Sequence, residues 1–122
     1  MIITSDYGVD RTEGTSPHTG IDYRAKSPVP VYIPGKGIIF SNPNSEYNTS
    51  TFRFTHGSFE NFVVQFLHLS SRSVAPGSSK AVKGGDVLGK TGSKGAATPH
   101  LHVQAFNAKG VRINPSVIYG KK

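Results

Sequence analysis

The sequence predicts an all-β fold, and the spacing of its apolar residues is the main reason. Short stretches of alternating apolar and polar residues recur along the chain, each bounded by Gly, Pro, Asn or Ser, as expected for strands with one buried face. No stretch repeats its apolar residues at helical spacing over three turns. With 122 residues, 14 of them Gly and 8 Pro, the chain fits one turn-rich domain, which we expect to span residues 1–122.

The first part of the chain predicts an extended lead-in followed by two strands. Residues 1–17 are largely polar and contain glycine, so we expect a lead-in and loop there. Residues 28–33 carry prolines, which cannot donate to a central ladder, and therefore predict an edge strand. Residues 37–40 follow a glycine turn as a second, apolar strand, and residues 42–50 have the composition of a polar loop.

The middle of the chain predicts a hairpin. Residues 51–56 alternate cleanly between polar and apolar side chains. Residues 57–61 turn the chain, and residues 62–69 form its most hydrophobic strand. The two strands are expected to pair because only a short turn separates them.

The C-terminal part predicts further short strands. Residues 74–89 contain two of them with Gly-rich turns, and residues 90–98 form a flexible loop. A strand then runs from residue 99 to 106. Residues 116–122 are expected to form a short basic tail.

Composition narrows the classes of partner. The chain has no cysteine, which excludes disulfides and thiolate metal sites. Its net charge is +7, and from residue 23 onward 13 basic residues stand against 3 acidic ones. Such a chain either favours polyanions, meaning nucleic acid, anionic lipid or anionic cell-wall polymers, or merely has a soluble basic surface. No apolar stretch is long enough for a membrane span, and the first residues lack the pattern of a secretory signal.

Two histidines at the start of the last long strand are the first candidate site. His100 and His102 are separated by Leu101. Alternate residues of a strand share a face, so both imidazoles are expected to point one way and Leu101 the other. Such a pair can serve one small object, or it can be two ordinary surface histidines of a strand.

Three further histidines lie in a loop or near the end of a predicted strand. His18 and Asp22 lie four apart around Gly20 on an extended segment, where they can converge on one ion or form a hydrogen bond within a loop. His68, near the end of the most hydrophobic strand, can project into a cleft or bond a carbonyl at its rim. His56 also ends a strand, but it adjoins a tight turn and is the weaker candidate.

Together these residues suit the chemistry of catalytic zinc. Such zinc commonly takes three His or carboxylate ligands and keeps a fourth position for water. His18, Asp22 and one histidine of the 100/102 pair would complete that set. The remaining member of the pair and His68 would then accept and donate the proton beside the water.

Three motifs also resemble a known family. The segments from His18 to Asp22 (HTGID), from His68 (HLS) and from His100 to His102 (HLH) resemble the HxxxD, HLS and HxH motifs of the lysostaphin-like, LytM-type M23 zinc metallopeptidases. The similarity runs from about residue 18 to residue 115 and includes residues 82–89, which resemble the family's VxxGxxIG segment.

The resemblance implies roles for the five polar residues. His18, Asp22 and His102 would bind one zinc ion, and His68 and His100 would be the catalytic histidines. The implied fold is an antiparallel β-sheet core with loops that wall a narrow active-site groove. No ligand is missing, which argues against the degenerate relatives that only activate other hydrolases.

Two positions depart from the family's usual pattern. Phe66 stands two residues before the HLS histidine, where Tyr is common, so a hydroxyl that would line the cleft is absent. Residues 93–99 differ from the Gly-Ser/Thr-x-Gly-Pro run that usually precedes HxH, which alters the expected groove.

The implied function is hydrolysis of peptide cross-links in bacterial peptidoglycan, in the periplasm or outside the cell. D-alanyl-diaminopimelate links are favoured over glycine bridges, because no glycine-bridge-binding module is recognisable. A compact phage-type lysin and a catalytic domain excised from a larger protein both fit. We expect a monomer whose basic surface is attracted to anionic envelope polymers.

Two alternatives belong to other functional classes. A non-catalytic wall-binding or regulatory domain would activate another hydrolase, but it should lack at least one of the five polar residues. A nucleic-acid-binding β-barrel would use the basic charge, yet it gives no reason for HxxxD and HxH together, so no nucleic acid is expected. Retarded DNA mobility without bound zinc would favour the barrel.

Overall fold

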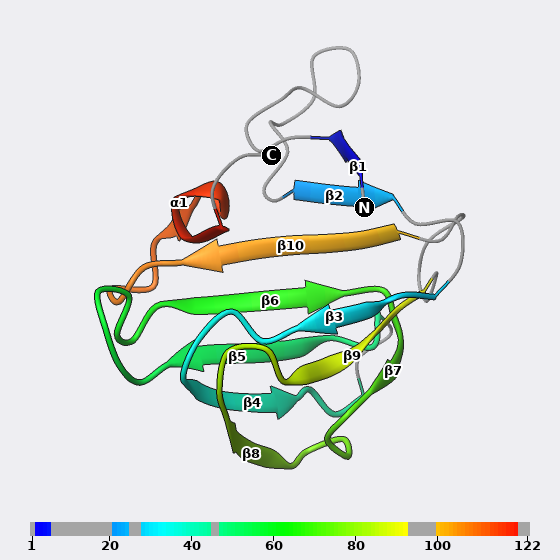
Figure 1. The fold of residues 1–122 in the computed structure, drawn as a ribbon, viewed down its shortest axis with the longest axis horizontal. Coiled ribbons are helices and arrows are strands. Elements are labelled where there is room, and N and C mark those ends of the chain that lie inside the picture. Colours follow the sequence, from blue (N-terminus) through cyan, green and yellow to red (C-terminus); the bar gives the residue numbers. More distant parts are fainter. Residues whose placement is uncertain (1, 6–20, 25–27, 45–46, 93–99, 120–122) are drawn as a thin grey trace.

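The computed structural model describes residues 2–5, 21–24, 28–44, 47–92 and 100–119, which form two antiparallel sheets and one short helix (Figure 1). In this part of the chain no helix has the length and apolar character needed to cross a membrane. The larger sheet has the strand order β1 (Ile2–Ser5), β2 (Ile21–Arg24), β10 (His100–Phe106), β6 (Val63–Leu67), β5 (Ser50–Phe54), β4 (Gly37–Ser41) and β8 (Ser79–Val82), with β11 (Arg112–Ile113) paired to β10. The smaller sheet has the order β3 (Pro30–Tyr32), β9 (Val87–Thr91) and β7 (Leu69–Arg72). The single-turn helix α1 (Ser116–Tyr119) follows β11.

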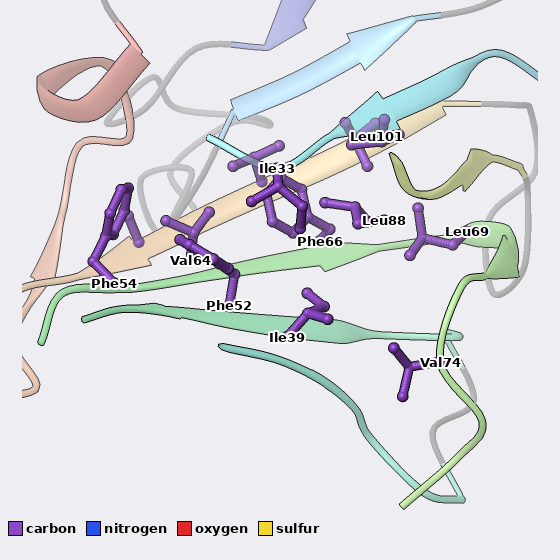
Figure 2. Packing of buried hydrophobic residues seen from close by; sticks show 13 residues of the cluster. Ile33, Ile39, Phe52, Phe54, Val64, Phe66, Leu69, Val74, Leu88 and Leu101 are labelled. Atoms are coloured by element: carbon purple, nitrogen blue, oxygen red, sulfur yellow. The ribbon is translucent and has the colours of Figure 1, made fainter. Parts of the chain in front are cut away.

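The hydrophobic core lies between the two sheets (Figure 2). Along each long strand of the larger sheet, alternate side chains turn toward the smaller sheet, as Phe52 of β5, Val64 of β6 and Leu101 of β10 do, each at most 2% exposed. Leu69 of β7 and Leu88 of β9 come from the smaller sheet into the same cluster. The opposite face of the larger sheet carries the side chains of His102 and Gln104, and the candidate site lies there.

The predicted fold class and most predicted strands are confirmed. The proline-containing strand is β3, at the edge of the smaller sheet, and residues 37–40 lie in β4. The predicted hairpin is the β5–β6 pair, in which Phe52 faces Val64 across the ladder. Residues 74–89 contain β8 and most of β9, but β9 continues to Thr91, into the residues expected to form a loop. The strand expected over 99–106 is β10.

The structure corrects four expectations. The lead-in over 1–17 contains β1, which pairs with β2, while residues 6–17 lie outside the described part. The tail contains α1, whose four residues are too few for a helical pattern. The strand expected over 62–69 is broken at His68. Phe66 is 2% exposed within the core, so the side chain at this position does not line a cleft on the opposite face.

Glycine is required where β9 passes close to β7. A Cβ atom on Gly89 would lie 2.3 Å from the backbone oxygen of Ser71, closer than any real contact of this kind. The turn before β9 is closed by Asp86, whose carboxylate accepts a hydrogen bond from the Lys83 amide. That backbone hydrogen bond holds the pKa of Asp86 below its usual value. Within residues 82–89, which resemble the family's VxxGxxIG segment, Gly89 is therefore needed for close packing and Asp86 for the turn.

Two buried serines give a matched test of what a buried hydrogen bond contributes to stability. Ser41 and Ser50 face each other across the β4–β5 ladder, and both are fully buried. The Ser41 hydroxyl donates to the Val74 carbonyl at 2.6 Å, whereas the Ser50 Oγ atom has no partner among the described residues. We expect Ser41→Ala to cost about 1–3 kcal/mol in the free energy of unfolding, and Ser50→Ala to cost about 0.5 kcal/mol or less, or to stabilise. Urea unfolding of the two variants measures this, and equal losses would contradict it.

Candidate functional site

Strand β10 contains both histidines of the predicted pair and lies between β2 and β6 in the larger sheet. Leu101, Val103 and Ala105 of this strand are at most 2% exposed and point into the core. Alternation therefore sends His102 and Gln104 to the opposite face. The β10–β2 ladder places His102 directly across from Asp22, and the β10–β6 ladder places it across from Leu67. Two residues that are 80 positions apart in the sequence thus become register partners.

His68 lies where the chain leaves the larger sheet for the smaller one. It stands between β6 and β7 with a φ of 67°, a left-handed conformation that is costly for a residue with a side chain. The segment at Tyr47 and Asn48 holds it there. The His68 amide donates to the Tyr47 carbonyl at 2.7 Å, and the Asn48 side-chain amide donates to the Leu69 carbonyl at 3.0 Å. The Tyr47 ring also packs edge-on to the imidazole, with 5.3 Å between ring centroids.

The structure brings His68 and His102 together. Their ring centroids are 6.4 Å apart, and the ring planes are nearly perpendicular. His102 is buried, at 9% exposure, and His68 is half-buried. His56 is separate from this pair, because its exposed ring contacts the neighbouring Thr55 hydroxyl at 2.7 Å beyond the end of β5.

Three of the predicted site residues are described only in part or not at all. His18 lies outside the described residues, and so does the 93–99 loop that was expected to shape the groove. Asp22 and His100 are placed by their strands alone. Among the described side chains there is no group of three potential metal ligands. The contribution of His18 to the site therefore stays a prediction.

A chain of polar side chains continues from His102 across the sheet. The His102 Nε2 atom lies 3.1 Å from Gln104 Oε1, and the Gln104 amide donates to Gln65 Oε1 at 2.7 Å. The Gln65 amide in turn donates to the Thr51 hydroxyl at 3.3 Å, so the chain spans β10, β6 and β5. Sequence reasoning missed both glutamines. Their positions in alternating strands, each polar between two buried apolar residues, were the available signal.

The donor set fits zinc. Imidazole nitrogen and carboxylate oxygen are ligands that zinc accepts in tetrahedral sites, and catalytic zinc commonly has three such ligands. A ligating histidine usually has its other ring nitrogen hydrogen-bonded to a carboxylate or carbonyl oxygen. His102 shows that arrangement, because Gln104 Oε1 contacts its Nε2 atom. Both the chemistry of the residues and the environment of His102 therefore suit a metal ligand.

Comparison with known proteins adds independent information. The sequence model of peptidase family M23 matches residues 16–115. A DD-carboxypeptidase/endopeptidase, Mpg, from Neisseria meningitidis is 36% identical over 108 residues, which cover 80% of this chain and 22% of that protein. The chain therefore spans about a fifth of the length of this curated relative.

Solved structures have the same fold. The catalytic domain of the prophage-encoded M23 protein EnpA from Enterococcus faecalis is 26% identical, with a TM-score of 0.75 over 98% of this chain and 92% of that one. The catalytic domain of the antimicrobial peptidase lysostaphin from Staphylococcus simulans is 24% identical, with a TM-score of 0.76 over the same shares of the two chains. The antiparallel architecture is thus the lysostaphin type that the sequence motifs implied.

Proposed function

The chain belongs to peptidase family M23, and from that membership we propose that it is a zinc-dependent endopeptidase that hydrolyses peptide cross-links of bacterial peptidoglycan. The observation that supports the proposal is the position of His102 relative to residues of the other two motifs. His102 lies across from Asp22 in the ladder, and its ring lies 6.4 Å from that of His68. A purely structural histidine pair would have no need of the costly backbone conformation of His68.

In this proposal the zinc ligands are His18, Asp22 and His102. Zinc bound there would supply a Lewis acid for the scissile carbonyl and would lower the pKa of the attacking water. His68 and His100 are the catalytic histidines: neutral imidazoles that accept a proton as water attacks and return one to the leaving amine. The tight hold of Tyr47 on His68 keeps that imidazole in place for the transfer.

The finer parts of the proposal concern substrate and setting. The D-alanyl-diaminopimelate cross-link is the proposed substrate, which the name of the Neisseria relative, a DD-carboxypeptidase/endopeptidase, supports. A phage-type lysin role has support in the prophage origin of EnpA. The proposed peptidase unit extends over residues 1–122, works as a monomer and acts on the cell wall.

Metal content and product analysis test the proposal together. The purified chain should contain about one zinc ion per molecule by elemental analysis. Digestion of purified sacculi should release muropeptides whose new ends, read by mass spectrometry, identify the bond that is cut. Intact sacculi after zinc has been supplied would overturn the peptidase and favour a wall-binding domain that activates another hydrolase.

The basic surface is proposed to attract the enzyme to anionic envelope polymers. Because salt screens exposed charges, with a Debye length of about 10 Å at 0.1 M and about 3 Å at 1 M, activity on sacculi should fall steeply as salt rises. Activity on a small uncharged peptide should be unaffected, and an equal salt response on both substrates would contradict the prediction. The exposed basic side chains of the described residues include Lys36, Arg53, Lys80, Lys83, Lys90 and Lys109.

A further inference from the structure

Gln104 stands between a buried histidine and an arginine. Its Oε1 atom lies 3.1 Å from His102 Nε2 and 3.1 Å from Arg112 Nη1. Arg112 comes from β11, which pairs with the end of β10, and its guanidinium lies over the Phe106 ring at 4.9 Å from the centroid. Side chains from two strands, His102 of β10 and Arg112 of β11, thus contact the same oxygen atom.

The chemistry of these groups fixes the orientation of the Gln104 amide. A guanidinium has only donors, so the Gln104 atom beside Arg112 has to be the acceptor, the oxygen. At the other end of the amide, the nitrogen donates to Gln65 Oε1 at 2.7 Å, and the Gln65 nitrogen donates onward to Thr51 Oγ1 at 3.3 Å. The Thr51 hydroxyl then donates to Asn42 Oδ1 at 2.7 Å. Each hydrogen bond in this series is donated in the same direction, from Arg112 toward Asn42. Reversing the Gln104 amide would place its NH₂ group against the guanidinium, where two donors would face each other.

This orientation has a consequence for His102. The oxygen that faces Arg112 also faces His102 Nε2, and an oxygen without hydrogen can only accept. The Nε2 atom must therefore carry the ring hydrogen. In a neutral imidazole only one nitrogen is protonated, so the Nδ1 atom then bears the lone pair.

We propose that Gln104, oriented by Arg112, is a positioning residue that keeps the hydrogen of His102 on Nε2 and so presents Nδ1 as the zinc-ligating atom. The inference rests on the proposed function in assigning a zinc ion to His102. The assignment of the ring hydrogen depends only on the hydrogen-bond chain from Arg112 to Asn42. The two parts can therefore fail separately.

Long-range ¹H–¹⁵N NMR of the histidine side chains tests the hydrogen position directly, in the full chain with zinc and after its removal by a chelator. The His102 signals are assigned by their loss in His102→Gln, and exposed His56 serves as the internal comparison. We expect His102 to be protonated at Nε2 in both samples. Protonation at Nδ1 in the metal-free chain would overturn the proposal, whatever the activity.

Variants of Gln104 and Arg112 test the positioning role through zinc affinity, measured by competition with a chelator. Gln104→Met keeps the approximate size but removes the acceptor, so we expect a mixture of His102 tautomers and about 10- to 100-fold weaker zinc binding. Gln104→Glu keeps an acceptor and should retain both the tautomer and the affinity. Arg112→Met frees the amide to reverse and should shift the tautomer ratio in the same direction as Gln104→Met.

The outcomes separate the positioning role from the proposed function. Unchanged tautomer and unchanged zinc affinity in folded Gln104→Met would overturn the positioning role while the peptidase stands. The expected tautomer in a wild-type chain that binds no zinc would overturn the zinc site instead. Should Gln104→Met not fold, the wild-type spectrum and Arg112→Met still decide the matter.

Discussion

Replacement of His68 by alanine is expected to lower peptidoglycan hydrolysis by about 10²- to 10⁴-fold while zinc stays bound. The proposed task of His68 is proton transfer, and His68 is not one of the three proposed zinc ligands. His102→Ala is expected to lose both the zinc and the activity, because it removes a buried residue that is a proposed zinc ligand and lies across from Asp22. Release of muropeptides from purified sacculi and zinc content by elemental analysis, measured on the same samples, distinguish the two variants.

His56→Ala is the matched control for both substitutions. It removes an imidazole that is exposed and lies beyond the end of β5, away from the 68/102 pair. Its activity and zinc content should equal those of the unchanged chain. Loss of zinc from His68→Ala would show that the roles of the two histidines have been assigned wrongly, and full activity in His68→Ala would remove it from the reaction altogether.

The strands were predictable because alternate residues of the larger sheet are buried in the core. Alternation along residues 51–54 and 63–66 becomes the hairpin of β5 and β6, in which alternate side chains enter the core. The break at His68 was not predictable, because residues 62–69 are mostly apolar and contain no Gly or Pro that would end a strand. Contacts with Tyr47 and Asn48, which are about 20 residues away in the sequence, impose the left-handed backbone there.

The candidate site was predictable as a set of motifs, and less so as an environment. Spacing alone indicated that His102 and Leu101 would point to opposite faces of a strand, and the structure adds the partner of His102 across the ladder and its partner along the strand. Gln104 and Arg112 could not be linked to His102 from the sequence, since the contact between them depends on β11 pairing back onto β10. The direction of a side-chain hydrogen-bond chain is a property of the folded sheet.

Phe52 is expected to be one of the most costly core positions to truncate. It is fully buried between the sheets, and its ring packs edge-on to that of Phe54 with 4.8 Å between centroids. Phe52→Ala removes a whole aromatic ring and leaves a cavity, which costs about 3–5 kcal/mol in the free energy of unfolding. That is a large share of the roughly 5–15 kcal/mol by which a folded domain is stable. Tyr32→Ala, at a side chain that is 56% exposed, should change stability by less than about 0.5 kcal/mol.

Zinc provides a further readout of the same substitution. Phe52 points into the core from β5, whereas His102 points to the opposite face of the sheet from β10. The core and the proposed metal site should therefore contribute independently to the free energy of unfolding. Saturating zinc should therefore raise the stability of Phe52→Ala and of the unchanged chain by the same amount, measured as the shift of the urea midpoint at fixed zinc concentration. A smaller zinc increment in Phe52→Ala would mean that the core packing itself holds the metal-binding face in shape. The core and the site would then be one cooperative unit.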